Sequence, residues 1–376
     1  MRLPPFLLDQ WLEQKFSADP PIEFDLGSST GPIWTLRELV SLDGDVEELL
    51  DTQLFYTPPA GSAELREELA RMEGVEPEHV LVMTGAAEAL LILFHLAAEP
   101  GANVVLPSPG FPTNEAVAQS LGLEVRRYML RAADSFRVDM DEIRSLVDDA
   151  TKLVLVNSPH NPTGAVLSEP DMEELHDFCA GRGVQFVSDE VYHPIYHGPA
   201  LRSAARLPHA TVLGDFSKAF CLSGLRIGWM IERDAGRRKQ CLNARSYFTV
   251  SGTVLGERLA ALATRHREVI YDRARRIAQT NLGLLDGLFS EHSDWLHWVR
   301  PAGGMTAFPW LASGIDAREF CQSLARHGVL MAPGDCFGMP AHFRLGFAAS
   351  GERFDRGIER FAAFLRTMAP RLTQHA

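Results

Sequence analysis

From about Val80 to Ile231, short β-rich apolar runs alternate with longer segments whose apolar residues recur at helical spacing. Segments such as AAEALLILFHLAA and EPDMEELHDFCAGRG are helical in this sense. The alternation predicts an α/β fold with a largely parallel sheet covered on both faces. Ligands of such sheets bind outside the carboxyl ends of the strands. The predicted strands are HVLVM from His79, NVVLP from Asn103, EVRRYM from Glu124, KLVLV from Lys152, QFVSD from Gln185, TVLGDF from Thr211 and RIGWMI from Arg226.

The rest of the chain predicts a second, smaller unit. The pattern is helical from about Ser251 to His292, and mixed after it. LHWVR, GMTAFPWL and HFRLGF predict strands, whereas DAREFCQSLARHG and ERFDRGIERFAAFLRTM predict helices. A chain of 376 residues is longer than one compact core usually holds. We therefore expect a large domain over residues 43–275 and a smaller α+β domain formed by residues 1–42 and 276–376.

Composition and charge narrow the functional classes. The chain is 46% hydrophobic and 23% charged, as in ordinary globular proteins. Its formal net charge of −13 argues against sequence-independent nucleic-acid binding, which needs a basic surface. The first residues do not form a secretory signal, and no apolar stretch is long enough to cross a bilayer. We therefore expect a cytoplasmic protein without a membrane partner.

Metal and dinucleotide chemistry find little support in the sequence. The five cysteines are scattered and lack C-x-x-C spacing, which predicts reduced, buried thiols. The histidines lack the spacing of metal ligands, so we expect no metal site. No G-x-G-x-x-G follows the first strand, and this excludes a Rossmann dehydrogenase.

A lysine at the end of a predicted strand is the strongest chemical signal. Lys218 is one of four lysines. It follows Gly-Asp-Phe-Ser and comes two residues after the end of the predicted strand TVLGDF. Small and apolar neighbours favour a lowered amine pKa, so that the amine can attack a carbonyl. Arg226 follows in a Gly-flanked apolar stretch, where a planar guanidinium suits a phosphate. A surface lysine and a core ion pair are the ordinary alternatives, but the joint spacing S-K-x(7)-R-x-G-W disfavours them.

The stretch SKAFCLSGLRIGW resembles the lysine signature of the class I and II aminotransferases, which are fold type I pyridoxal-5′-phosphate (PLP) enzymes. Other segments match family motifs in the same order, over about Asp25 to Phe347. They are Thr-Gly-Ala-Ala-Glu from Thr84, Asn-Ser-Pro-His-Asn-Pro-Thr-Gly from Asn157, and Asp-Glu-Val-Tyr from Asp189. The resemblance implies a seven-stranded, mostly parallel sheet domain plus a smaller α+β domain. It also implies a homodimer with shared active sites.

The resemblance implies a role for each matching residue. Lys218 would hold PLP as a Schiff base and then act as general base at the substrate Cα. Asp189 would face the pyridine nitrogen, and Tyr192 and Asn161 the phenolic oxygen. The remaining cofactor contacts would be Gly85, Ala86, Ala87, Ser217 and Arg226, with Phe111 stacked on the ring and Tyr56 reaching the phosphate from the other subunit. The substrate carboxylate would be bound by Arg344, with Asn161 and Gly31 beside it.

Three of these residues also have ordinary structural interpretations. Asp189 follows a strand and would suit the N-cap of a helix. Phe111 would suit an apolar core. Arg344 lies between aromatic residues and would suit a cation–π contact.

One residue departs from the family pattern. Relatives commonly carry Ser or Thr three residues before the lysine as a phosphate ligand, whereas this chain has Asp215. A carboxylate repels a phosphate dianion. We therefore expect Asp215 either to turn away from the phosphate or to pair with a cation such as Arg226.

The type of reaction stays open between two enzymes and one regulator. Segments 27–31, 303–309 and 327–338 resemble the capreomycidine synthase subgroup, whose reaction eliminates a hydroxyl from a hydroxyarginine and closes a ring. Plain aminotransferases share parts of these segments. We expect an aminotransferase acting on an amino acid, with elimination and cyclisation as the alternative. A PLP-binding regulator would need an extra DNA-binding domain, for which the chain has no room.

Overall fold

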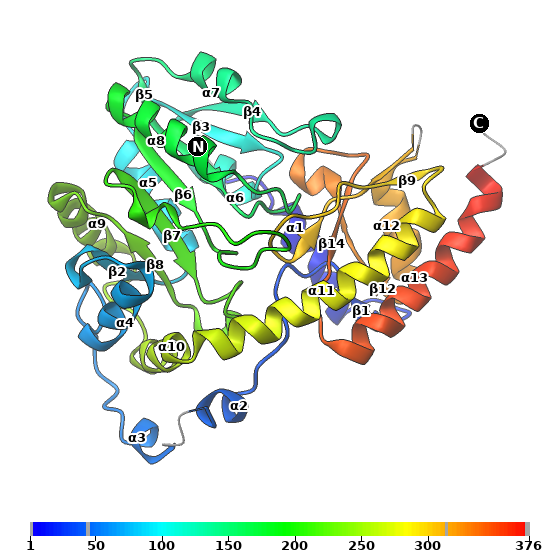
Figure 1. Cartoon of the computed structure of the whole chain (residues 1–376), viewed down its shortest axis with the longest axis horizontal. Coiled ribbons are helices and arrows are strands. Elements are labelled where there is room, and N and C mark those ends of the chain that lie inside the picture. Colours follow the sequence, from blue (N-terminus) through cyan, green and yellow to red (C-terminus); the bar gives the residue numbers. More distant parts are fainter. Residues whose placement is uncertain (1–2, 43–45, 313–314, 373–376) are drawn as a thin grey trace.

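The computed structural model describes residues 3–42, 46–312 and 315–372. Its largest element is a seven-stranded sheet of order β2-β8-β7-β6-β5-β3-β4 (Figure 1). Strand β8 is antiparallel to both of its neighbours, and the other neighbouring pairs are parallel. The strands are β2 (Val80–Met83), β3 (Asn103–Ser108), β4 (Glu124–Met129), β5 (Thr151–Asn157), β6 (Gln185–Asp189), β7 (Ala210–Asp215) and β8 (Gly228–Ile231). The predicted α/β class and the seven predicted strands are confirmed.

The sequences of these strands are mostly continuous apolar runs because both faces of the sheet are buried. In β2, Val80 and Val82 belong to one apolar cluster and Leu81 and Met83 to another. The second cluster includes residues of α5 (Ala86–Ala97), α6 (Pro112–Ser120) and α9 (Ala235–Phe248). The first includes residues of α4 (Ala63–Glu73), α7 (Met140–Leu146), α8 (Glu169–Arg182) and α10 (Val254–Arg265).

A smaller unit of short strands lies beside the sheet (Figure 1). Its pairs are β1 with β12, β9 with β11, and β14 with both β10 and β13. Phe24 pairs with Val329, so the N-terminal segment packs on this unit. The strands are β1 (Phe24–Asp25), β9 (Leu296–His297), β10 (Thr306–Ala307), β11 (Trp310–Leu311), β12 (Val329–Leu330), β13 (Ala332–Pro333) and β14 (Phe343–Gly346).

The predicted strand GMTAFPWL is two strands, β10 and β11, separated by Phe308 and Pro309. Proline has no N–H to donate to a strand partner, which accounts for the interruption. The helices of this unit are as predicted, α12 (Ala317–Arg326) and α13 (Gly351–Leu372).

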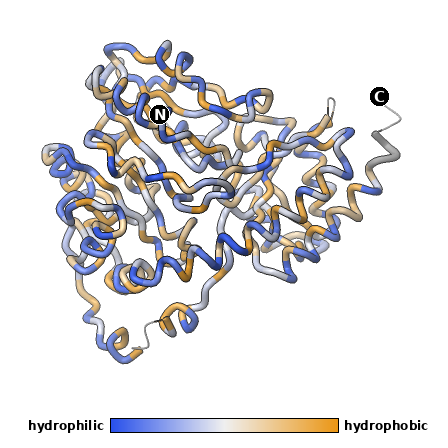
Figure 2. Tube along the Cα trace, in the orientation of Figure 1, coloured by the Kyte–Doolittle hydropathy of each residue, from blue (hydrophilic) through white to orange (hydrophobic). Residues whose placement is uncertain are grey.

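The helical segment after Ser251 consists of α10 and the long α11 (Arg267–Glu291), which runs from the large sheet to the smaller unit (Figure 1). Polar and apolar residues alternate along α11 (Figure 2), as expected of a helix buried on one side. The expected domain boundary after residue 275 falls within α11, and the one at residue 43 lies outside the described residues. The division into two domains stays a prediction. The remaining α-helices are α1 (Leu7–Leu12), α2 (Leu36–Val40) and α3 (Val46–Leu50).

Two further features bear on the sequence predictions. All five cysteines are free and buried, as predicted. Over the described ranges, the helices include none with an apolar stretch sufficient to cross a membrane.

Candidate active site

A cavity of about 240 Å³ lies at the carboxyl ends of β5, β6 and β7. It brings together residues that are far apart in the sequence and that share a predicted role in cofactor binding. They are Ala86, Ala87, Phe111, Asn161, Asp189, Tyr192, Ser217, Lys218 and Arg226. Leu90, Asn157, Val191, Asp215 and Ser223 complete the lining.

Lys218 lies in the turn that follows β7 and lines the cavity. Its Nζ atom donates a hydrogen bond to Ser29 Oγ at 2.8 Å. Burial lowers the pKa of Lys218 to about 8, and the nearby charge of Arg344 adds to this effect. A substantial fraction of the amine is therefore unprotonated slightly above neutral pH, as a nucleophile requires.

Asp189 ends β6 with its side chain almost fully buried, at 6% exposure. Its Oδ1 atom accepts a hydrogen bond from the N–H of Val191 at 3.2 Å, in a turn where no helix begins. The N-cap interpretation is therefore wrong. Burial raises the pKa of Asp189 to about 7, and the negative charges of Asp215 and Glu190 add to this effect. A cationic N–H, such as that of a protonated pyridine ring, would favour the ionised carboxylate.

The turn before α5 is shaped for close approach of an anion. Gly85 has φ +74°, and a Cβ atom there would lie 2.7 Å from Nη2 of Arg226. The missing side chain thus leaves a gap between the start of α5 and the guanidinium. Arg226 Nη1 also donates to Ser217 Oγ at 3.2 Å. Backbone N–H groups at a helix start and a guanidinium are the donors that a phosphate group needs.

Asp215 lies between these donors and is held by backbone amides. Its Oδ2 atom accepts from the N–H of Ala86 at 2.7 Å, and Oδ1 from the N–H of Ser217 at 2.5 Å. Among the ion pairs of the described residues there is none between Asp215 and Arg226. Pairing with Arg226, one of the two arrangements expected for Asp215, is therefore wrong, and two backbone N–H groups take up the carboxylate oxygens instead.

Arg344 on β14 contacts Asn161. It is 2% exposed, and its Nη atoms donate to Gly27 O at 2.7 Å and to Asn161 Oδ1 at 3.3 Å. Its Nε atom is buried and has no hydrogen-bond partner within the described part of the chain. The guanidinium carbon also lies 5.2 Å from the centroid of the Phe337 ring, so the cation–π contact exists as well. An orphaned N–H beside a guanidinium edge is suited to an incoming carboxylate.

Of the other predicted residues, Tyr192 and Phe111 line the cavity, whereas Gly31 and Tyr56 do not. Tyr192 donates its hydroxyl hydrogen to Ser29 O at 3.0 Å. Phe111 lines the cavity and packs edge-on against Phe6. Gly31 contacts the loop after Lys218, where a Cβ atom would approach Sγ of Cys221 to 2.2 Å. Tyr56 is 73% exposed and lines no part of this cavity in the single chain.

Two residues of the site had no role in the sequence analysis. Asn157 joins two motifs, since its Oδ1 accepts from Asn161 N at 2.8 Å and its Nδ2 donates to Asp189 O at 2.9 Å. Ser29 contacts both Lys218 and Tyr192. Both belong to segments that resemble the family, and this was the available signal. Their contacts depend on the tertiary fold.

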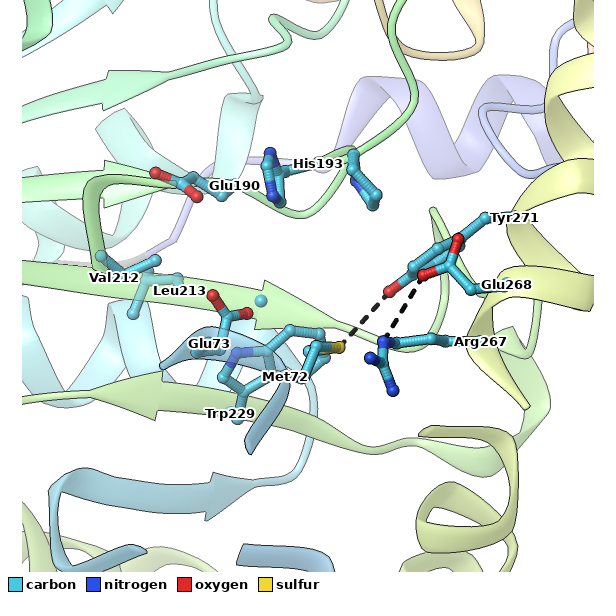
Figure 3. Close-up of a pocket in the computed structure, with 12 residues that line it drawn as sticks. Met72, Glu73, Glu190, His193, Val212, Leu213, Trp229, Arg267, Glu268 and Tyr271 are labelled. Carbon is cyan, nitrogen blue, oxygen red and sulfur yellow. Dashed lines mark hydrogen bonds and ion pairs between the residues drawn. The ribbon is translucent and has the colours of Figure 1, made fainter. Parts of the chain in front are cut away.

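A second cavity, of about 210 Å³, contains none of the predicted site residues (Figure 3). Glu73, Glu190, Trp229 and Tyr271 line it, and burial together with Glu190 raises the pKa of Glu73 to about 8. Arg267 also lines this cavity, and its guanidinium lies 3.6 Å from a carboxylate oxygen of the neighbouring Glu268. Without an amine or an uncompensated cation, this cavity is a poor candidate for the catalytic site.

Comparison with known proteins agrees with this geometry. Residues 42–361 match the family model for aminotransferases of class I and II. The chain is 31% identical to capreomycidine synthase of Streptomyces vinaceus, over 98% of this chain and 95% of that protein. The structure is similar to a PLP-dependent aminotransferase from Streptococcus suis, with a TM-score of 0.90, 29% identity and 98% and 99% coverage. It is also similar to the PLP-dependent cyclase OrfR, with a TM-score of 0.88, 27% identity and 98% coverage of both chains.

Proposed function

The chain belongs to the class I and II aminotransferases, and from this premise we propose that it moves the amino group of an amino acid to a keto acid, using Lys218 as the attachment point of its cofactor. The protein is an enzyme whose cofactor is PLP. When bound, PLP supplies an electron sink for the negative charge that develops at the substrate Cα. The observation that carries the proposal is one cavity lined by the amine of Lys218, the carboxyl of Asp189 and the guanidinium of Arg226.

The proposed cofactor contacts follow from the residues that line the cavity. Lys218 would hold PLP as a Schiff base, which its pKa of about 8 favours. Asp189 would keep the ring nitrogen protonated, because its negative charge favours a cationic N–H beside it. That N–H in turn offsets the burial of the carboxylate. Phe111 would pack on the ring, and Asn161 and Tyr192 would hold its phenolic oxygen. The phosphate would be bound at the start of α5 by Gly85, Ala86 and Ala87, together with Ser217 and Arg226.

The proposed substrate contacts use the small unit of the fold. Arg344 would bind the α-carboxylate, with Asn161 and Gly31 next to it. In this orientation the substrate Cα would face Lys218, whose amine, once released, would remove the proton at that carbon. The buried, partnerless Nε of Arg344 supports the assignment.

We also propose a homodimer with shared active sites. Leu54, Phe55 and Tyr56 are 78%, 77% and 73% exposed, and three consecutive apolar residues of this kind are typical of an interface. Tyr56 would reach the phosphate of the partner, and two-fold symmetry would make the contact reciprocal. The cytoplasm is the proposed location, since five buried free thiols suit a reducing compartment.

A second reaction is the elimination and cyclisation carried out on a hydroxylated arginine. The 31% identity to capreomycidine synthase over 98% of the chain supports it. Both reactions need the same Lys218, Asp189 and Arg344. They differ only after the Cα proton has been removed, when either the cofactor accepts a proton or the side chain loses its leaving group.

Single-turnover mixing with a panel of amino acids separates the two reactions. The panel should include arginine and its hydroxylated forms. Transamination converts the cofactor to pyridoxamine phosphate and releases a keto acid, which is the result we expect. If no amino acid does this, while a hydroxyarginine loses water and leaves PLP intact, the aminotransferase proposal is wrong and the cyclase reaction takes its place.

A further inference from the structure

Asp215 places a carboxylate in the part of the cavity where the phosphate of PLP is proposed to bind. Its Oδ2 atom accepts from the N–H of Ala86, the first residue of α5, and the side chain is 6% exposed. The free N–H groups at a helix start are those that bind an anion. The carboxylate therefore already occupies one of the donors that would serve the phosphate.

The donors that remain border this carboxylate. A Cβ atom at Gly85 would lie 2.7 Å from Nη2 of Arg226 and 3.2 Å from Oδ2 of Asp215, so both side chains border the same point of the loop. The N–H of Ala87 follows in the first turn of α5. A phosphate bound by Arg226 and Ala87 would therefore be a close neighbour of the Asp215 carboxylate.

The charges that face Asp215 do not neutralise two anions. Lys218 and Arg226 lie on the loop after β7, and the charges of Asp189 and Asp215 both act on Lys218. On α5, Glu88 binds elsewhere, to the N–H of Thr84 at 2.5 Å. Once Lys218 is joined to the cofactor and Asp189 faces the ring nitrogen, Arg226 is left opposite both the carboxylate and the phosphate dianion. Like charges held this close in a buried site strongly disfavour double ionisation.

We propose that Asp215 and the phosphate of PLP hold one proton between them, so that phosphate binding takes up a proton from solution. Two acidic groups in contact titrate as a pair, and the shared proton makes an O–H···O hydrogen bond. That bond would replace the contact between a side-chain hydroxyl and the phosphate in relatives that carry Ser or Thr at the position of Asp215. The inference rests on the proposed position of the phosphate and is independent of the reaction type.

Calorimetry on the full chain freed of its cofactor tests the proposal. The probe is pyridoxine 5′-phosphate, which lacks the aldehyde and cannot bond to Lys218. Titration at pH 7 and pH 8, in buffers of different ionisation enthalpy, measures the protons taken up on binding. The matched variant is Asp215→Asn, which keeps the size of the side chain and one acceptor oxygen. The contribution of the pyridine ring is common to both proteins and cancels in the difference. Because the charge of Asp215 acts on Lys218, both titrations are repeated with Lys218→Ala in each protein, which removes the contribution of that amine.

The wild type should take up about one proton more than Asp215→Asn, and its affinity should fall by about tenfold per pH unit relative to the variant. Asp215→Ser, which restores the hydroxyl of the relatives, should behave like Asp215→Asn. Equal proton uptake in wild type and variants would overturn the proposal, as would a failure of pyridoxine 5′-phosphate to bind. If neither variant folds, zero uptake by the wild type alone would still refute it. Failure of transamination would show in the amino-acid panel and would leave these titrations unchanged.

Discussion

Replacing Asp189 by Asn should stabilise the cofactor-free enzyme while weakening its function. The carboxyl is 6% exposed, and burial raises its pKa from an ordinary 3.8 to about 7. The folded protein therefore binds more protons than the unfolded chain between these two values, and stability falls as the pH rises through this range. The interval of about three pH units corresponds to about 4 kcal/mol of unfolding free energy, lost in full above pH 7.

Asparagine removes this penalty because it has no charge to bury. Its side-chain oxygen can accept the N–H of Val191 as Asp189 does. Urea unfolding of cofactor-free Asp189→Asn should therefore show a gain of up to about 4 kcal/mol at pH 8 and almost none at pH 4. With PLP bound, the gain should shrink, because the ring N–H stabilises the ionised carboxylate of the wild type.

A surface carboxyl with the opposite perturbation provides the control. Hydrogen bonds from Asn103 and Arg126 lower the pKa of Asp148 to about 2, so its ionised form stabilises the fold. Asp148→Asn should therefore destabilise the protein at pH 8. A gain for Asp189→Asn that is absent at pH 8, or as large at pH 4 as at pH 8, would refute the argument from burial.

Three further predictions follow from contacts in the site. Arg344→Lys should raise the KM for the amino acid roughly a hundredfold, because losing a forked carboxylate contact costs about 3 kcal/mol. An unchanged KM would contradict the proposed binding of the substrate carboxylate by Arg344. Gly31→Ala should lower the unfolding free energy by about 1–3 kcal/mol, since the new Cβ meets Cys221 Sγ, and the double variant with Cys221→Ala should recover most of it. Sedimentation should show a dimer, and a fully active monomer would exclude shared sites. Tyr56→Phe should weaken PLP binding about tenfold without changing the mass of the sedimenting dimer.

The large sheet could be predicted because its strands are buried on both faces. Val80 to Met83 and Thr151 to Asn157 are continuous β-rich runs bounded by turns, and each run is a strand. The strands of the smaller unit were predicted less well. Most are two residues long, as β12 and β13 are, and so short an element produces no periodic pattern.

The residues of the site could be predicted where a local motif carries them. Asp189 ends β6 and Lys218 follows shortly after the end of β7, and the carboxyl ends of parallel strands meet at one edge of the sheet. The contacts between motifs could not be predicted. Ser29 reaches Lys218 across 189 positions, and Asp215 reaches Ala86 across 129. Neither pairing leaves a local trace, and the amide partners of Asp215 are backbone groups that any sequence would offer.

Borohydride reduction of the purified enzyme tests the central claim most directly. Reduction turns a Schiff base into a stable secondary amine, so the pyridoxyl group remains on the lysine that held it. Proteolysis and mass spectrometry then locate the label among Lys15, Lys152, Lys218 and Lys239. We expect the label on the peptide that contains Lys218. Label on another lysine, or none on an enzyme that retains PLP and is active, would contradict the account.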